Sequence, residues 1–225
     1  MVTPDKNLDT LPYWLLNVSE PEKGATCPPY LLNLSPKELS IISTLDSAYH
    51  ILTWSEVRQV IADNALDVFQ RKPSDLRRYL QYNHYLKQEY GSVMKFVLQE
   101  RLLWTEPIVP EGKPFEKSED VRILWNDWPY GVDDKIVHLV VWTKFELKED
   151  PTTEDLTDEV RIGIERFVGR TFAEEVGKEN VLWFKNWQSL KSVASVEHFH
   201  VMLYDPHPTF VKRITNGDVP LSQKL

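Results

Sequence analysis

The spacing of two histidines is the clearest chemical signal in this chain of 225 residues. His198 and His200 lie two positions apart within an apolar run at 195–204 that has the composition of a β-strand. Side chains alternate along a strand, so both imidazoles and Met202 are expected on one face, with the intervening apolar residues on the other. Such a pair is typical of a metal site, of a nucleophile with a supporting group, or of two histidines packed in a core.

A third histidine occupies a second apolar run. His138 lies in the segment 136–144, whose β-branched and aromatic residues also favour a strand. If the two strands are neighbours, His138 falls on the same sheet face as the pair. Three imidazoles would then converge. A His-x-His pair with a carboxylate would suit zinc or non-haem iron, and the available third donors are Glu197, His138, Asp205 and His207. Glu197 is a poorer third ligand than His138, because it faces away from His198 on a regular strand.

An aromatic segment between the expected strands could hold a ring. Asn126 and Asp127 could bond the hydroxyls of a ribose or a sugar, and Trp128 or Tyr130 could stack on a base or a pyranose ring. The same residues are equally typical of a turn without any ligand, since the side chains of Asn and Asp readily hydrogen-bond their own backbone.

Two groups of basic residues could neutralise a phosphate. Lys144 ends the segment that contains His138. The second group lies at the start of an expected helix, where free amide groups also favour anions, and consists of Arg71, Lys72, Arg77 and Arg78. A solvated helical face is the more common explanation for such a group.

The composition limits the classes of function. A net charge of −8 and an isoelectric point near 5.3 argue against broad binding to duplex nucleic acid or to anionic membranes. The single Cys27 permits no internal disulfide, and residues 1–10 do not resemble a secretory signal. No apolar run approaches the length of a transmembrane helix. We therefore expect a cytoplasmic protein.

The hydrophobic pattern predicts an α+β fold. Helical spacing follows a capping box at Thr53 and Glu56, and further helices are expected at 74–90 and 92–104. Strands at 121–125 and 136–143, a helix ending near Gly177, and strands at 181–185 and 196–204 complete the C-terminal half. The expected division is an irregular arm at 1–35, a helical subdomain at 36–106 that caps the sheet, a linker at 107–118, an α+β core at 119–210 and a tail at 211–225.

The C-terminal half resembles the histidine-triad (HIT-like) superfamily, particularly its nucleotide transferases and dinucleotide phosphorylases. The matching pieces are 124–129, 138–144, 156–159, Asn186, Ser192 and 198–200. The resemblance implies a HIT-like antiparallel sheet with a helix. It also implies that His200 attacks the α-phosphorus of a nucleotide while His198 supports it. Met202 stands where that superfamily has a third histidine or a glutamine, and no glycine precedes the pair at 188–196.

A second resemblance covers most of the chain. The strings at 53–57, 71–76, 123–131, 138–144, 184–187 and 196–200 are similar to the fungal N-acetylglucosamine-induced protein family. This resemblance implies a cytosolic protein of the amino-sugar response, without supplying a reaction.

Together these patterns predict a protein that binds a nucleotide or a nucleotide sugar and transfers or hydrolyses at the phosphate through His200. The expected ligand contacts, besides the aromatic segment, are His138, Lys144, Asn186 and Ser192. No cofactor and no protein partner is indicated. The alternatives are a non-catalytic regulatory or scaffold protein of amino-sugar or chitin metabolism, which Met202 and the missing glycines favour, and a histidine-based metalloenzyme.

Overall fold

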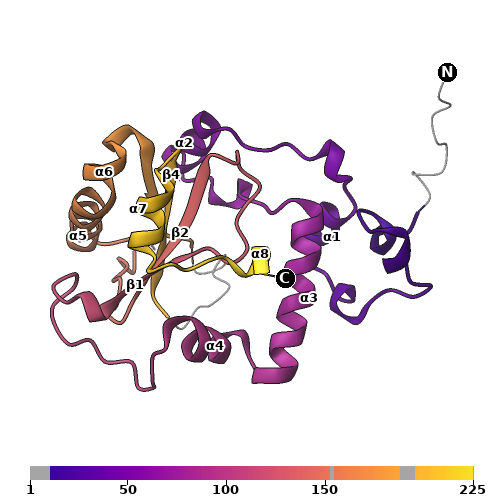
Figure 1. Ribbon diagram of the computed structural model, residues 1–225, viewed down its shortest axis with the longest axis horizontal. Coiled ribbons are helices and arrows are strands. Elements are labelled where there is room, and N and C mark those ends of the chain that lie inside the picture. Colours follow the sequence, from indigo (N-terminus) through magenta and orange to yellow (C-terminus); the bar gives the residue numbers. More distant parts are fainter. Residues whose placement is uncertain (1–10, 153–154, 188–195, 225) are drawn as a thin grey trace.

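The computed structural model describes residues 11–152, 155–187 and 196–224. Within these residues the chain forms a four-stranded antiparallel sheet with helices on both faces, as Figure 1 shows. The fold is therefore α+β, as the sequence predicts.

The two strands that carry the histidines lie in the middle of the sheet. The strands are β1 (Val121–Trp125), β2 (Ile136–Thr143), β3 (Val181–Phe184) and β4 (His198–Tyr204). Their order is β1-β2-β4-β3, so β2 and β4 are hydrogen-bonded neighbours. Central strands are covered on both faces, which explains why both runs are almost wholly apolar in sequence.

One face of the sheet packs against α5 (Asp158–Val168) and α7 (Pro208–Ile214). Leu139 lies opposite Val201, and Val141 lies opposite Phe199, with all four side chains fully buried. A π-helical turn, Gly169–Ala173, connects α5 to the short α6 (Glu174–Val176). This layer is the larger hydrophobic core, and it leaves the histidines on the opposite face.

The opposite face lies beneath α3 (Pro73–Tyr90) and α4 (Val93–Phe96), which continues as a π-helical turn, Val97–Leu102. The helix α3 begins at a proline, whose fixed φ suits the first helical position. It ends at Gly91, whose φ of 77° is a left-handed conformation that favours glycine. The short α8 (Leu221–Lys224) lies against α3, so the C-terminal segment crosses this side of the sheet (Figure 1).

Helices α1 (Pro36–Ile42) and α2 (Trp54–Ala62) each begin with a capping box. The box predicted for α2 is present: the Glu56 carboxylate accepts from the Thr53 backbone N–H at 2.8 Å, and the Thr53 hydroxyl accepts from the Glu56 N–H at 3.4 Å. Each box satisfies amide groups that would otherwise lack partners in the first turn. Short 3₁₀ helices occupy Tyr13–Leu15, Glu20–Glu22, Pro29–Leu31, Asp46–Ala48, Leu66–Val68, Ser118–Asp120 and Lys178–Asn180.

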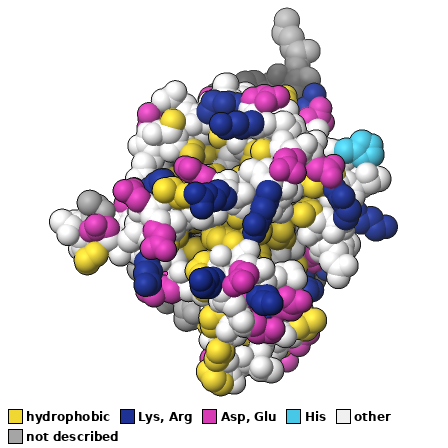
Figure 2. Space-filling view, turned by 90° about the vertical axis from the view of Figure 1, so that its left-hand side faces the viewer, with side chains coloured by type: hydrophobic (Ala, Val, Ile, Leu, Met, Phe, Trp, Pro, Cys, Tyr) yellow, Lys and Arg dark blue, Asp and Glu magenta, His cyan; other side chains and the backbone are white. Residues whose placement is uncertain are grey.

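The surface over α5 and α6 mixes charges of both signs. Figure 2 views the molecule from that side and shows basic and acidic side chains interspersed, with hydrophobic side chains visible between them. Such a face is an ordinary solvated layer. In the part of the chain that the structure describes, every helix is too short or too polar to cross a bilayer.

Phe199 tests how strongly the sheet depends on this core. Its ring is fully buried and lies within 6.3 Å of the rings of Phe115, Phe167 and Trp183. We expect Phe199→Ala to lower the free energy of unfolding by about 3 to 5 kcal/mol, from lost burial and the cavity left behind. Urea unfolding measures the change. The control Val109→Ala, at a side chain that is 62% exposed, should change stability by less than about 0.5 kcal/mol. A loss below about 1 kcal/mol for Phe199→Ala would contradict the assigned packing.

Candidate functional site

Strand pairing brings His138 and His200 together. In the β2–β4 register His138 lies opposite Met202, and Val140 lies opposite His200. The two histidines are thus diagonal neighbours on one face, and His138 Nε2 lies 3.0 Å from His200 Nδ1. The sequence left the adjacency of the two strands open, and the structure places them side by side.

Both ring nitrogens of His200 have partners. Nδ1 meets His138, and Nε2 lies 3.1 Å from Nδ2 of Asn186. The ring also stacks on Phe184, with centroids 4.9 Å apart and planes inclined by 12°. The Asn186 amide reaches the Tyr130 hydroxyl at 3.2 Å as well. His200 is therefore held on all sides, and an attack by either nitrogen first requires one hydrogen bond to break.

The Asn186 amide can present either end to His200. If Nδ2 donates to Nε2 of His200, then His200 Nδ1 carries the proton and donates to His138, which leaves the Asn186 Oδ1 buried and without a partner. If Oδ1 instead faces the ring, Nε2 donates to it and His138 donates to Nδ1. In that state Asn126 Nδ2, 3.4 Å away, donates to His138 Nδ1. In both states one end of the amide lacks a partner within the described residues.

The two paired histidines are neutral. Burial lowers the pKa of His138 to about 3, and the positive charge of Arg71 acts in the same direction. Burial also lowers the pKa of His200 well below its ordinary value, with further contributions from His138, His198 and Arg71. Neither imidazole therefore acts as a cation toward a phosphate at neutral pH.

His198 has a defined tautomer. Its Nδ1 lies 2.8 Å from the Val196 carbonyl oxygen, which can only accept, so Nδ1 carries the proton and Nε2 carries the lone pair. The ring packs against Trp142 with centroids 4.5 Å apart, and it borders a cavity. The strand therefore places a histidine of fixed orientation at the edge of the cavity.

The cavity lies between the histidine face of the sheet and the helices α3 and α4, and its volume is about 100 Å³. Its wall includes the rings of Tyr79, Tyr82, Phe96, Trp128, Tyr130 and Trp142. An engineered apolar cavity of about 150 Å³ takes up benzene, so this space matches a single ring. The predicted residues Asn126, Asp127, Trp128, Tyr130, Asn186, His198 and His200 all border it.

Arg71 is the cation on this wall that lacks an acidic partner. Its Nε donates to the Trp128 carbonyl at 2.9 Å, and its guanidinium lies 4.0 Å from the centre of the Tyr79 ring and 5.6 Å from that of Tyr130. No described carboxylate is in ion-pair contact with it. The terminal nitrogens therefore remain available to an anion.

Arg101 also borders the cavity, but two carboxylates neutralise its charge. It bonds Asp127 at 2.9 Å and Asp218 at 2.7 and 2.8 Å. Asp127 additionally accepts from the Leu221 backbone N–H at 3.1 Å. Burial raises the pKa of Asp127, and the charge of Arg101 opposes that effect. The expected hydroxyl contact at Asp127 would have to compete with this network, which fixes the C-terminal segment over the cavity.

Three predicted contacts are not placed at the cavity. His138 is buried and does not border it; it contacts His200, which does. Lys144 does not border the cavity; its ammonium lies 3.4 Å from Glu111 and 3.8 Å from the buried Asp120. Asp120 in turn accepts hydrogen bonds from the backbone N–H groups of Glu111 and Gly112. Lys144, Glu111 and Asp120 therefore hold the loop before β1 in place. Ser192 lies outside the described residues.

Of the basic cluster at 71–78, only Arg71 borders the inner cavity. Lys72 pairs with Asp46 at 3.2 Å. Arg77 donates to the Trp14 carbonyl and Arg78 to the Ser222 carbonyl, each at 2.8 Å. The cluster therefore holds distant segments against α3. The sequence placed Arg71 in this cluster but did not link it to the histidines. It did not predict that Tyr79, Tyr82 and Arg101 border the cavity, because they lie in helical segments with ordinary amphipathic patterns.

The metal interpretation gains no support from the geometry. Within the described residues no group of three or more His, Cys, Asp or Glu side chains is arranged to hold a metal ion. The facing nitrogens of His138 and His200 lie at hydrogen-bond distance, so a proton lies between them and their lone pairs do not converge on a shared ion.

The chain belongs to a family of proteins of unknown function, DUF3605, whose model matches residues 53–204. This range includes the sheet, α3 and most of the cavity wall.

Two curated relatives resemble the chain. N-acetylglucosamine-induced protein 1 of Candida albicans is 29% identical over 185 residues, which cover 73% of each chain. An uncharacterized protein of Saccharomyces cerevisiae is 25% identical over 163 residues, covering 70% of this chain and 81% of the relative. The resemblance to the N-acetylglucosamine-induced protein family is thereby confirmed.

A solved structure shares the fold. The crystal structure of HTC1 aligns with a TM-score of 0.60 at 23% identity, covering 75% of this chain and 98% of that chain. The similarity confirms the architecture alone, and the histidine-triad resemblance stays a prediction.

The neutral histidines predict how stability depends on pH. An unfolded histidine titrates near pH 6.5, whereas folded His138 has a pKa of about 3, so the unfolded state binds more protons between these values. The contribution of the neutral histidine to the free energy of unfolding is therefore fully present above about pH 6.5. It decreases as the pH falls below that value, by about 1.4 kcal/mol per pH unit for each such histidine. We expect His138→Gln to reduce this slope by about that amount in urea unfolding between about pH 6 and 4.5.

The matched control for this slope is Met202→Leu, at the fully buried neighbour opposite His138. It alters the same packing without removing a titrating group, so its stability should be lower at every pH with the slope unchanged. Equal slopes for His138→Gln and the wild type would contradict the neutral, buried state.

Proposed function

We propose that this protein binds a nucleotide or a nucleotide sugar in the cavity between the sheet and α3. The observation that carries the proposal is Arg71, a cation that lies on the wall of an aromatic cavity and forms no ion pair with any carboxylate at 11–152, 155–187 or 196–224. Arginine presents planar, bidentate donors that match a phosphate.

The cavity wall suits the remaining parts of such a ligand. Tyr82 and Trp128 lie 5.9 Å apart and offer ring faces to a planar base. Asn83 borders the same space and makes no hydrogen bond to a described residue, and one end of the Asn186 amide is unpartnered. A buried amide oxygen without a partner, such as that of Asn186, is costly, and a ligand with a hydroxyl or N–H group would satisfy it.

The biological setting follows from the relatives. The Candida albicans relative is named for induction by N-acetylglucosamine, and we extend that amino-sugar link to this chain. The strand–helix–strand order and the late His-x-His strand support a HIT-like core with an N-terminal helical cap. We retain the proposed division at 1–35, 36–106, 107–118, 119–210 and 211–225, and the proposed cytoplasmic location.

Any turnover would take place at the phosphate. The resemblance to the histidine-triad superfamily assigns the attack to His200, both of whose nitrogens are engaged. We assign this role to His198, because it borders the cavity with its orientation fixed by the Val196 carbonyl, and we give His200 a positioning role. His198 Nε2 would form an N–P bond as the P–O bond to the leaving group breaks. Water would then cleave the N–P bond and restore the imidazole.

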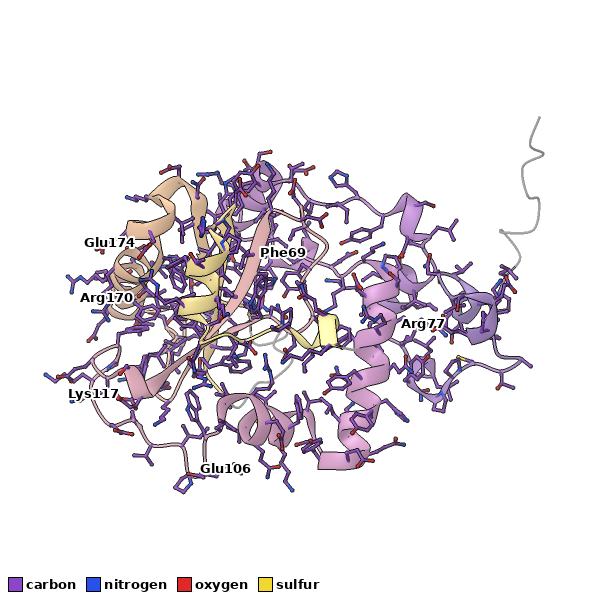
Figure 3. The ribbon with its side chains drawn as sticks, in the orientation of Figure 1. Phe69, Arg77, Glu106, Lys117, Arg170 and Glu174 are labelled. Carbon is purple, nitrogen blue, oxygen red and sulfur yellow. The ribbon has the colours of Figure 1, made fainter. Side chains whose placement is uncertain are left out.

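The Arg71 contact is tested by Arg71→Gln. Hydrogen bonds to a charged group are worth about 1.5 to 3 kcal/mol, so we expect the affinity for UDP-N-acetylglucosamine to fall about tenfold or more by isothermal titration. The control is Arg170→Gln, on the opposite side of the sheet, where Figure 3 labels it. Its exposed side chain bonds the Phe115 carbonyl, and the affinity should not change. No binding of any nucleotide to the wild type would refute the proposal.

A second candidate is a non-catalytic regulatory or scaffold protein. The specific observation in its favour is the saturated, neutral pair His138–His200, which is built for fixed geometry and has no nitrogen available without rearrangement.

Turnover separates the two candidates. If the protein is an enzyme, His198→Gln should abolish release of product from a bound nucleotide, by at least about a hundredfold for a lost nucleophile or base, with binding retained. The control His207→Gln, at an exposed residue outside the cavity, should keep activity. Wild-type protein that binds nucleotide but releases no product would select the regulatory candidate.

A further inference from the structure

We infer, building on the proposed nucleotide site, that the ligand extends past Arg71 into a second space, and is therefore a nucleoside diphosphate joined to a sugar rather than a mononucleotide. The second space has a volume of about 240 Å³ and lies beside α1 and α3. Arg71, Tyr79 and Tyr130 border both this outer space and the inner cavity. The two spaces are therefore neighbours that share these three side chains as a wall, with Arg71, which has no ion-pair partner in the described residues, between them.

The position of Arg71 sets where the negative charge lies. Its Nε is fixed on the Trp128 carbonyl and its plane lies over the Tyr79 ring, so the guanidinium is held at the junction. A ligand that matches this arrangement has its anionic group in the middle and an uncharged group at each end. A sugar joined to a nucleoside through a diphosphate has that order, whereas a mononucleotide ends at its phosphate.

The sizes of the two spaces agree with this order. The inner cavity of about 100 Å³ accepts one ring, which we assign to the base, so the ribose lies at the junction beside Arg71 and the terminal sugar needs the outer space. The inner wall is rich in aromatic residues, which suits the planar base.

The outer wall combines polar and apolar groups. Lys37 and Gln70 offer hydrogen-bonding side chains there, while Phe69 offers a ring that stacks on Tyr130 at 5.1 Å. Figure 3 labels Phe69 between the sheet and the helices of the N-terminal half. A sugar presents hydroxyl groups at its edge and an apolar face, so it matches such a wall.

The test compares UMP, UDP and UDP-N-acetylglucosamine by isothermal titration on the wild type and on Gln70→Trp. The Gln70 side chain has no hydrogen-bond partner in the described residues, and tryptophan would fill the outer space. We expect the wild type to bind the nucleotide sugar at least tenfold more tightly than UMP. Gln70→Trp should bind the nucleotide sugar no more tightly than UMP, and its affinity for UMP should stay within about twofold of that of the wild type. The control Gln88→Trp, on the exposed side of α3, should behave as the wild type.

The outcomes separate the two proposals. If no nucleotide binds the wild type, the proposed function itself fails. If UMP and UDP bind, but the sugar adds nothing and Gln70→Trp matches the wild type, the two-space inference alone is overturned. Should Gln70→Trp fail to fold, Lys37→Glu replaces it, because this exposed change places a negative charge at the outer space. It should weaken the nucleotide sugar more than UMP, whereas Lys212→Glu on α7 should weaken neither. Equal weakening of both ligands by Lys37→Glu would also overturn the inference.

Discussion

The antiparallel pairing of β2 with β4 is the constraint on which the rest of the structure depends. Its register places Leu139 and Val141 against Val201 and Phe199 on one face, and His138 beside His200 on the other. A shift by one residue would exchange the two faces and place imidazoles in the hydrophobic core. The apolar face therefore fixes the positions of the histidines, and the energy that holds the site comes largely from residues that never reach it.

Burial of two neutral histidines shows how the site is organised. Desolvation removes their charge, and the hydrogen bonds through Asn126, Asn186 and Tyr130 replace the lost water. A network of this kind fixes ring orientation precisely, because each unmade bond would be costly at low dielectric. It does not by itself supply a reactive group. His198, with its Nδ1 fixed on a backbone carbonyl, is the member of the strand whose basic nitrogen is defined.

The sequence predicted the strands, the shared face of His198 and His200 and the α+β class because these features depend on local periodicity. It placed His138 on that face only if the two strands are neighbours, which the structure shows. It could not predict which tertiary neighbours complete the site. Arg71 looked like part of a solvated cluster, and its role depends on the Trp128 carbonyl 57 positions away. Asp127 looked like a sugar contact, but Arg101 and the backbone N–H of the distant Leu221 bond it. Such contacts link residues far apart in the chain, and no single-sequence pattern encodes them.

The comparison of the two arginines on the cavity wall is a stronger guide to function than the histidine pair. Arg101 is matched by two carboxylates, so its burial is explained by folding alone. Arg71 is held by one carbonyl and two rings, and its charge is not matched within the described residues. The positive charge of Arg71 also lowers the pKa of both buried histidines. Under the proposed function an anionic ligand would supply that match, and the two spaces that share Arg71 as a lining residue would give it room on both sides of its charge.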